Sequence, residues 1–253
     1  MAIIRILISG YNGRMGRVLD ALARDDPEIN VVAGIDINDE KTGDCPVYKN
    51  IGDFPDIADV VIDFSSPLSL ESLLEYCQVN NTPLVLCATG YSSEQIEAIK
   101  RVAEHVAIFR SGNMSLGINL IIDLIKRACC VLGESFDVEI VESHHRHKID
   151  APSGTALMLA EAAASALPYE PEYIYDRQSR RSQRAMREIG ISSLRGGTIV
   201  GEHEVIFAGL DEVISLKHSA ASRDVFAVGA LRAAKYMAGI KTPGMYDMRD
   251  VLI

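Results

Sequence analysis

The sequence predicts an α/β protein with two domains: an N-terminal domain built on a parallel sheet, and a second domain of the α+β class. Over the first 110 residues, short and almost entirely apolar strands alternate with helical patterns. Strands of this kind are typical of a parallel sheet with helices on both faces. Beyond residue 115, apolar positions alternate with polar ones, as in a half-solvated sheet. The length of 253 residues is compatible with one or two domains of about 150 residues each.

The elements of the first domain are expected to follow one another in strand and helix order. The helix that opens at Ser92 has a capping box, because Ser92 and Gln95 can each accept a hydrogen bond from the backbone N–H of the other. The expected elements are a strand at Ile3–Ser9, a helix at Gly13–Arg24, strands at Val31–Asp36 and Val60–Phe64, a helix at Leu68–Val79, a strand at Leu84–Cys87, the Ser92 helix and a strand at Val106–Arg110.

The second domain begins with a long amphipathic helix and ends before a helix that resembles those of the first half. The expected elements are a helix at Gly117–Leu132, a strand at Phe136–Ser143, an alanine-rich helix at Thr155–Leu167, an arginine-rich polar stretch at Arg177–Arg187, strands at Thr198–Phe207 and Glu212–Lys217, and a helix at Val225–Met237. We therefore expect residues 1–114 to form a dinucleotide-binding domain on which residues 224–253 pack back, and residues 115–223 to form a substrate-binding and oligomerisation domain.

Charge and composition exclude several classes of protein. Acidic residues outnumber basic ones by 35 to 25, and a net charge of −10 disfavours nucleic-acid binding. The Arg177–Arg187 stretch has no interleaved aromatic residues, so we interpret it as a solvated linker rather than an RNA-binding patch. The apolar helix near residue 120 carries Asp123, Lys126 and Arg127, which argues against a membrane span. Five cysteines without a C-x-x-C pair and the absence of a signal peptide predict a soluble cytoplasmic protein.

A glycine-rich turn follows the first strand and predicts a dinucleotide site of the Rossmann type. Gly10, Gly13 and Gly16 permit a tight turn, and the helix that follows presents free N–H groups to a pyrophosphate. Asp36 ends the next strand, where an acidic side chain can accept hydrogen bonds from a ribose diol. A turn that only packs a helix against a strand is the alternative. The candidate cofactor contacts are Gly10, Tyr11, Asn12, Gly13, Arg14, Met15, Asp36, and the loop residues Cys87, Ala88, Thr89, Gly112, Asn113, Met114 and Ser115.

The segment from Glu142 to Thr155 contains three of the six histidines beside a lysine. A metal site is disfavoured, because His144 and His145 are adjacent and no second Cys/His pair exists. A solvated loop is a second interpretation. A catalytic and anion-binding loop is the third, because histidine and lysine suit proton transfer, and Ser153, Gly154 and Thr155 precede a helix whose N-terminus attracts anions. The third interpretation implies hydride transfer coupled to proton transfer on a small carboxylate substrate.

Four motifs together point to one family. They are Gly10-x-x-Gly13-Arg14-Met15-Gly16, Glu142-x-His144-His145-x-x-Lys148-x-Asp150-Ala151-Pro152-Ser153-Gly154-Thr155, Arg195-Gly-Gly-x-Ile-Val-Gly-Glu-His203 and His218-x-Ala-x-Ser222-Arg223. Over essentially its whole length the chain resembles the dihydrodipicolinate reductases (4-hydroxy-tetrahydrodipicolinate reductases) of the diaminopimelate route to lysine. Two departures stand out: Cys87-Ala88-Thr89 replaces a usual Gly-Thr-Thr, and Asn12 replaces a glycine found in many members.

The resemblance implies an NADH- or NADPH-dependent reduction of a ring dicarboxylate. It implies that His144 acts as acid or base, that Lys148 donates a proton, and that His145, Gly154 and Thr155 contact a substrate carboxylate. It also implies a homotetramer, for which the apolar alternation at Val205, Phe207, Val213 and Ile214 offers additional support. Asp36 has no cationic neighbour at the next two positions, so we expect a preference for NADH, although Lys41 could offset it. Another two-domain reductase and a non-catalytic nucleotide sensor remain alternatives.

Overall fold

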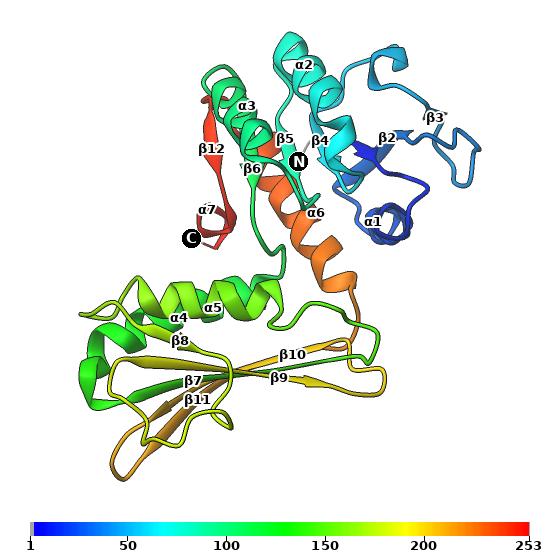
Figure 1. Cartoon of the computed structure of the whole chain (residues 1–253). Coiled ribbons are helices and arrows are strands. Elements are labelled where there is room, and N and C mark those ends of the chain that lie inside the picture. Colours follow the sequence, from blue (N-terminus) through cyan, green and yellow to red (C-terminus); the bar gives the residue numbers. More distant parts are fainter. Residues whose placement is uncertain (1–2, 253) are drawn as a thin grey trace. The chain divides into compact units, whose positions relative to one another are not determined.

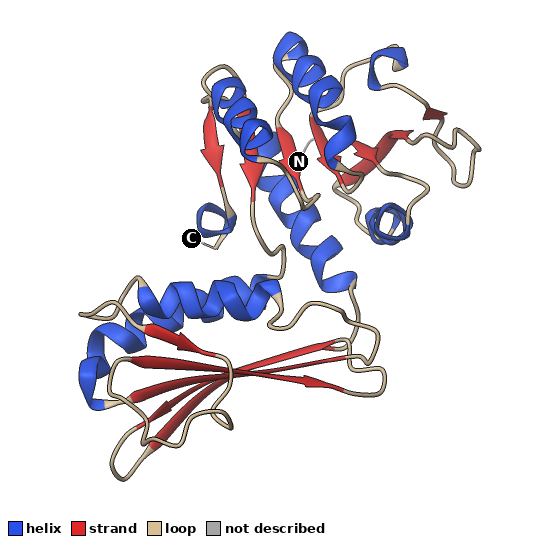
Figure 2. Ribbon diagram, in the orientation of Figure 1, coloured by secondary structure: helices blue, strands red, loops and turns tan. Residues whose placement is uncertain are grey.

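The computed structural model describes residues 3–252, which form two compact units. Unit 1 contains the chain up to Ser115 and the segment from Asp224 onward, and unit 2 contains Leu116–Arg223. The fold class predicted from the sequence is confirmed: one unit holds a parallel sheet with helices, and the other holds a mixed sheet (Figures 1 and 2).

Unit 1 is a seven-stranded parallel sheet with the strand order β12-β6-β5-β4-β1-β2-β3. Its strands are β1 (Ile4–Ser9), β2 (Ile29–Ile35), β3 (Val47–Tyr48), β4 (Val60–Asp63), β5 (Leu84–Leu86), β6 (Ala107–Arg110) and β12 (Gly244–Tyr246). Its helices are α1 (Arg14–Arg24), α2 (Leu70–Asn80), α3 (Ser93–Ala103), α6 (Asp224–Ala238) and α7 (Met248–Val251), with 3₁₀ turns η1 (Ile51–Asp53) and η2 (Pro67–Ser69).

Helices lie on both faces of this sheet, as the apolar strands require (Figure 2). Helix α6 contacts α1, β4 and β5, and α2 contacts α3 and η1. Lys235 of α6 forms ion pairs with Asp26 and Glu28 at distances of 2.7 and 2.6 Å. The segment after residue 223 therefore belongs to the same body as the first 115 residues.

Unit 2 is a five-stranded mixed sheet in the order β11-β10-β7-β9-β8, with two helices on one face. Its elements are α4 (Leu116–Leu132), η3 (Gly133–Ser135), β7 (Asp137–His144), α5 (Gly154–Ala164), β8 (Glu172–Ile174), β9 (Glu188–Arg195), β10 (Gly201–Ala208) and β11 (Val213–Ala220). Strands β10 and β11 run antiparallel to their neighbours, whereas β7, β8 and β9 are parallel.

The helix-facing side of the unit 2 sheet changes character along the strands. At one end this face is apolar: Val138 and Ile140 on β7 and Val205 on β10 form a buried core with α4 and α5. Further along the strands, the same face carries Glu142 and His144 on β7, Arg195 on β9 and His203 on β10. Since the side-chain period of a strand is two, the same alternation that builds the core continues into a polar cluster.

Several elements were not predicted from the sequence. Strands β3, β8, β9 and β12 and helix α7 are additional to the expected set. Strand β9 contains Gly190, Ser192 and Ser193, which have weak strand preference. Gly190 is nevertheless required there, since a Cβ would stand 1.8 Å from a carboxylate oxygen of Glu139.

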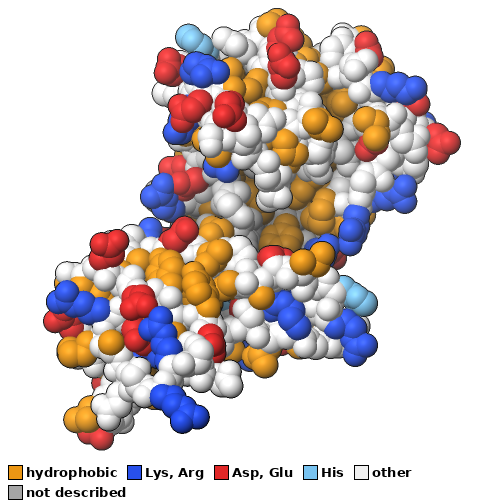
Figure 3. All heavy atoms as spheres, in the orientation of Figure 1, with side chains coloured by type: hydrophobic (Ala, Val, Ile, Leu, Met, Phe, Trp, Pro, Cys, Tyr) orange, Lys and Arg blue, Asp and Glu red, His pale blue; other side chains and the backbone are white. Residues whose placement is uncertain are grey.

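The arginine-rich stretch is docked on the sheet, so its interpretation as a solvated linker was incomplete. Arg184 donates to Asp137 and Glu139 on β7, and Arg177 forms ion pairs with Glu139 and Glu188. These contacts neutralise much of the positive charge of the stretch within the molecule. On the face shown in Figure 3, basic and acidic side chains are interspersed over both units.

Candidate active site

The glycine turn of unit 1 lies where the strand order reverses. Strand β1 has β2 on one side and β4 on the other, and Gly10 follows its carboxyl end. Open α/β sheets bind ligands at this edge. Gly10 has φ +78°, and a Cβ there would stand 2.9 Å from the backbone of Ser65. A Cβ on Gly16 would stand 2.2 Å from the carbonyl oxygen of Gly10, so the turn packs backbone against backbone.

The first turn of α1 can present its N–H groups to an anion. The N-cap residue of α1 is Gly13, which has no side chain. No side chain of the N-cap residue therefore accepts hydrogen bonds from the first N–H groups of the helix. Gly13 and Arg14 are exposed and Met15 is half-buried. The Tyr11 ring, by contrast, is buried, so Tyr11 can meet a ligand only through its backbone.

Asp36 lies directly after β2 and is joined to the glycine turn. One carboxylate oxygen accepts from the Asn12 N–H at 2.9 Å, and the other accepts from the Asn38 N–H at 3.1 Å. The Asn12 side chain donates to the carbonyl groups of Asn38 and Glu40 and accepts from Thr42. Asn12 thus holds the loop that follows Asp36, a role that a glycine in its place could not fill.

Two further predicted loops follow β5 and β6 at the same carboxyl edge. In the first, Cys87 and Ala88 are half-buried and Thr89 is exposed. In the second, Gly112 is exposed, whereas Asn113, Met114 and Ser115 are buried, and Asn113 Oδ1 accepts from the Ser115 N–H at 2.8 Å. Much of the second loop can therefore offer a ligand little side-chain surface.

Asp63 joins its own turn after β4 to Tyr91, which follows the β5 loop, and sequence reasoning missed it. The side chain is fully buried at the end of β4, where it accepts from Ser65 N–H at 3.0 Å and from the Tyr91 hydroxyl at 3.3 Å. Burial raises the pKa of this carboxyl above its usual value. An acidic residue at the end of an otherwise apolar strand is the sequence signal that could have identified it.

In unit 2, His144 and Glu142 face the same side of β7 and form a close pair. Nδ1 of His144 lies 2.6 Å from Oε2 of Glu142. The guanidinium of Arg195 on β9 holds both oxygens of this carboxylate, at 2.7 and 2.9 Å. Glu142 is completely buried, and His144 is 9% exposed.

The loop after β7 carries Lys148 beside Asp150. The Lys148 ammonium lies 2.8 Å from an Asp150 carboxylate oxygen, and its side chain is 22% exposed. Arg195 also donates to the backbone carbonyl of Asp150 at 2.6 Å, which ties the loop to β9. His145 is half-buried, its ring lies 6.3 Å from that of His147, and its Nδ1 has no partner among the described residues.

Ser153 begins α5 and joins the helix terminus to the histidine cluster. Its hydroxyl accepts from the Ala156 N–H at 3.1 Å and lies 3.0 Å from Nε2 of His203. Its own N–H donates to Glu142 at 3.2 Å. Gly154 and Thr155 form the first turn of α5, where N–H groups lack partners within the helix. The structure thus brings together the predicted residues His144, Lys148, Ser153, Gly154 and Thr155 within unit 2.

The protonation states follow from this environment. Burial raises the pKa of Glu142, but hydrogen bonds from Arg195, Ser193 and His144 outweigh it and bring the pKa to about 2. Burial lowers the pKa of His144 despite its contact with Glu142. Burial also lowers the pKa of His203 to about 4. At neutral pH the cluster therefore holds an ionised Glu142 and two neutral histidines.

The sequence interpretation missed Glu142, Arg195 and His203 as parts of this cluster, although all three lie in the recognised motifs. A partial signal was available: Glu142 and His203 each lie two residues from an apolar core position on an expected strand, whereas Arg195 lies on β9, which the sequence did not predict. Among residues 3–252, no group of three or more His, Cys, Asp or Glu side chains is arranged to hold a metal ion.

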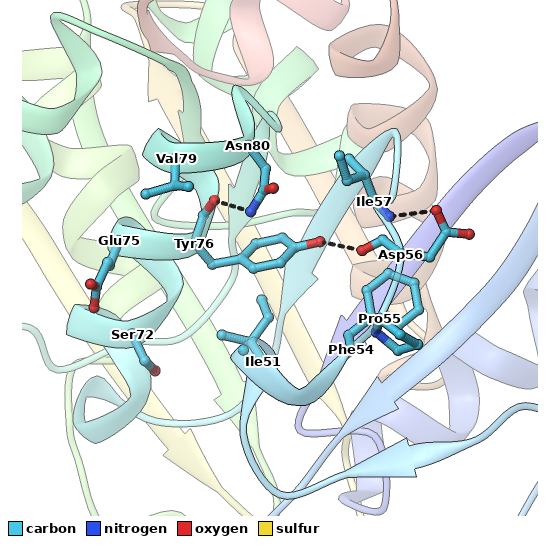
Figure 4. Close-up of a pocket in the computed structure, with 11 residues that line it drawn as sticks. Ile51, Phe54, Pro55, Asp56, Ile57, Ser72, Glu75, Tyr76, Val79 and Asn80 are labelled. Carbon is cyan, nitrogen blue, oxygen red and sulfur yellow. Dashed lines mark hydrogen bonds between the residues drawn. The ribbon is translucent and has the colours of Figure 1, made fainter.

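A pocket of about 540 Å³ lies elsewhere in unit 1, between η1 and α2 (Figure 4). Tyr76 spans it and donates to the backbone carbonyl of Asp56 at 3.3 Å, and Val79 and Ile57 form part of its lining. None of the predicted site residues lines this pocket.

Within the described part of the chain, no helix has both the length and the apolar character that a membrane crossing requires.

Comparisons with known proteins identify the family of the chain. The family models described as "Dihydrodipicolinate reductase, N-terminus" and "Dihydrodipicolinate reductase, C-terminus" match residues 4–114 and 117–252. The 4-hydroxy-tetrahydrodipicolinate reductase of Caldanaerobacter subterraneus subsp. tengcongensis is 50% identical over 98% of both chains. That of Clostridium tetani is 48% identical over 98% of this chain and 97% of the relative.

A solved structure shows the same fold. The dipicolinate-bound dihydrodipicolinate reductase from Paenisporosarcina sp. TG-14 superposes with a TM-score of 0.83 at 24% identity, covering 99% of this chain and 100% of that one. The family predicted from the motifs is confirmed by these matches. The chain belongs to the dihydrodipicolinate reductase family of NAD(P)H-dependent oxidoreductases.

Proposed function

We propose that this enzyme reduces 4-hydroxy-tetrahydrodipicolinate (dihydrodipicolinate) to tetrahydrodipicolinate in the diaminopimelate route of lysine biosynthesis, using NADH or NADPH. The observation that carries the proposal is the unit 2 cluster, in which a histidine and a lysine lie on the segment that leads into a helix N-terminus. Relatives that are 48–50% identical over nearly the whole chain have the name of this activity.

The dinucleotide is assigned to the carboxyl edge of the unit 1 sheet. The residues fit such a ligand, because the first turn of α1 has no side-chain cap and Gly10 allows the backbone to turn tightly beside it. In the proposal, Gly10–Met15 contact the pyrophosphate, Asp36 accepts from a ribose diol, and the loops at Cys87–Thr89 and Gly112–Ser115 flank the nicotinamide. When bound, the reduced nicotinamide supplies the hydride.

The substrate is assigned to unit 2. Gly154 and Thr155 offer N–H groups and a hydroxyl to one carboxylate, with Ser153 and His145 beside them. Reduction of a ring carbon conjugated to an imine leaves electron density that an acid must neutralise. Lys148 carries an ammonium group and is assigned as that donor, and His144 is assigned as the acid or base that exchanges a proton through Nε2.

Cofactor choice is assigned to Asp36. Its carboxylate is suited to a ribose diol and repels a 2′-phosphate, and Ile37 and Asn38 add no positive charge. We therefore propose a preference for NADH. A homotetramer and a cytoplasmic location complete the proposal.

One assay tests the activity directly. Purified protein is coupled to a dihydrodipicolinate synthase, and the loss of reduced-nicotinamide absorbance is followed. We expect oxidation that depends on the synthase product. A folded protein, as judged by circular dichroism, that oxidises neither NADH nor NADPH under these conditions would contradict the proposal.

A further inference from the structure

We propose that Glu142 is a positioning residue for the reaction: it holds the His144 imidazole with a proton on Nδ1 and aligns that ring with the N-terminus of α5. The inference rests on the function proposed above, which assigns proton exchange to His144 and carboxylate binding to the first turn of α5. It concerns a residue that touches neither substrate nor cofactor in that assignment.

The first observation is that each oxygen of the buried Glu142 carboxylate accepts hydrogen bonds from at least two donors. Oε2 accepts from His144 Nδ1 at 2.6 Å and from Arg195 Nη1 at 2.9 Å. Oε1 accepts from Arg195 Nη2 at 2.7 Å and from the Ser153 N–H at 3.2 Å. The side chain has no exposed surface. A buried carboxylate held in this way by a bidentate arginine stays ionised and acts only as an acceptor.

The tautomer of His144 follows from that charge. Because an ionised carboxylate has no proton to give, the contact requires His144 to donate from Nδ1. In the neutral ring, Nε2 then carries the lone pair and becomes the nitrogen that can take up and return a proton. Without Glu142, either nitrogen could carry the proton, and only a fraction of the enzyme would have the reactive nitrogen in its useful state.

Glu142 is the acidic side chain that contacts His144, and the other groups described around the ring are cationic, neutral or paired elsewhere. Arg195 on β9 and Lys148 on the following loop are cationic, and the His203 ring on β10 lies 5.2 Å away in an edge-on arrangement. His218 on β11 pairs across the strands with His203. Asp150 is engaged by Lys148. Glu142 thus balances a largely cationic or neutral group of side chains around the ring.

The same carboxylate also fixes the second half of the site. Ser153, whose N–H donates to Glu142, is the N-cap of α5 and directly precedes Gly154. One side chain therefore sets the distance between the proton-exchanging ring and the N–H groups assigned to the substrate carboxylate. Misplacement of either group by about 1 Å is enough to lower a rate substantially.

A measurement on the unmodified enzyme tests the tautomer. The ¹⁵N chemical shifts of the His144 ring are recorded in histidine-labelled protein above pH 7, and the signals are assigned by their absence from the His144→Gln spectrum. We expect Nδ1 to carry the proton. An Nε2–H tautomer would overturn the proposal whether or not the enzyme turns over the proposed substrate, so the result is distinguishable from a failure of the proposed function.

Kinetics of Glu142→Gln test the consequence. We expect kcat to fall about 100- to 10,000-fold, the range for loss of a positioned acid or base. The limb of the kcat–pH profile that belongs to His144 should move to lower pH, because loss of the negative neighbour disfavours the imidazolium. Glu161→Gln, which removes an exposed carboxylate from α5, should leave both unchanged.

Folding is monitored by NADH binding and circular dichroism. Glu142→Gln leaves Arg195 without its partner and can fail to fold for that reason. In that case the double variant Glu142→Gln/Arg195→Met, which removes the unpaired charge, is used for the kinetic test instead. A folded variant with wild-type kcat and an unmoved pH profile would refute the positioning role.

Discussion

His144 and Lys148 lie four residues apart, yet their partners differ. His144 is buried against a carboxylate that is held by arginine, whereas Lys148 is partly exposed and forms an ion pair with Asp150 on its own loop. This difference supports separate tasks. The buried imidazole is neutral at neutral pH, because burial lowers its pKa. The ammonium group of Lys148 is the side chain with a proton to give.

We expect His144→Gln and Lys148→Ala each to lower kcat about 100- to 10,000-fold. The affinity for NADH should be unchanged, because both residues belong to unit 2 and the dinucleotide is assigned to unit 1. The double variant should lose less than the product of the two single losses, since groups that act together are non-additive. Steady-state kinetics and NADH fluorescence titration measure these quantities.

Two variants serve as controls for this prediction. His105→Gln, an exposed histidine of unit 1, should have wild-type kinetics. Thr155→Val should chiefly raise KM, since it removes a hydrogen bond to a charged group worth about 1.5–3 kcal/mol. If both His144→Gln and Lys148→Ala instead raise only KM, these residues bind substrate and the proton donor lies elsewhere.

Asp36 carries the prediction on cofactor choice. Its two oxygens accept from the backbone at Asn12 and Asn38, so the carboxylate is fixed at the end of β2. A fixed negative charge repels a 2′-phosphate, and we expect kcat/KM to be higher with NADH than with NADPH. Asp36→Asn should reduce the ratio of kcat/KM for NADH to kcat/KM for NADPH, whereas Asp39→Asn, on the same loop, should not. A wild-type preference for NADPH would mean that Asp36 has been misassigned.

Among the helices and strands, those with a strong hydrophobic periodicity were predicted from the sequence, whereas strands that depend on pairing with distant strands were missed. Strands β1, β4 and β5 are apolar runs between turn residues, and each was expected near its observed place. Strand β9 exists because β7 and β8 pair with it on either side, despite its glycine and serines. The two-residue β3 and the three-residue β12 are too short to carry a pattern.

The candidate site shows the same division. His144, Lys148, Ser153, Gly154 and Thr155 lie close in sequence, so their association could be predicted from a local motif. Arg195 and His203 reach the cluster from β9 and β10, through the register of strands that are more than 50 residues away from β7. No local pattern specifies that register, so these two contacts could not be derived from the sequence alone.

Two helix caps provide a matched test of stability against function. Ser92 caps α3 in a capping box with Gln95, as predicted, and Ser153 caps α5. Each Ser→Ala change should lower the free energy of unfolding by about 1 kcal/mol. Ser92→Ala should leave kinetics unchanged, whereas Ser153→Ala should also raise the substrate KM, because its hydroxyl contacts His203. Denaturant unfolding and kinetics separate the two; equal kinetic effects would contradict the assignment of α5 to the substrate.

At the scale of the whole molecule, one face of the unit 2 sheet is the basis for the proposed tetramer. Helices α4 and α5 cover the other face. Two of the four residues in the sequence argument, Val205 and Phe207, are buried against those helices and belong to the unit 2 core, whereas Val213 points to the second face. The residues that do point to the second face include Val213, which is 64% exposed, and Leu194, which is 54% exposed.

An exposed apolar sheet face invites burial by association, and closed symmetric assembly is the usual outcome. We expect light scattering to give four times the chain mass of 27.6 kDa at micromolar concentration. Leu194→Asp should lower that mass, because a carboxylate buried in an apolar interface is costly. Val79→Asp, at an exposed apolar position on α2 of unit 1, should not lower it. A wild-type protein with the mass of one chain would rule out the tetramer, and an unchanged mass for Leu194→Asp would move the interface to another surface.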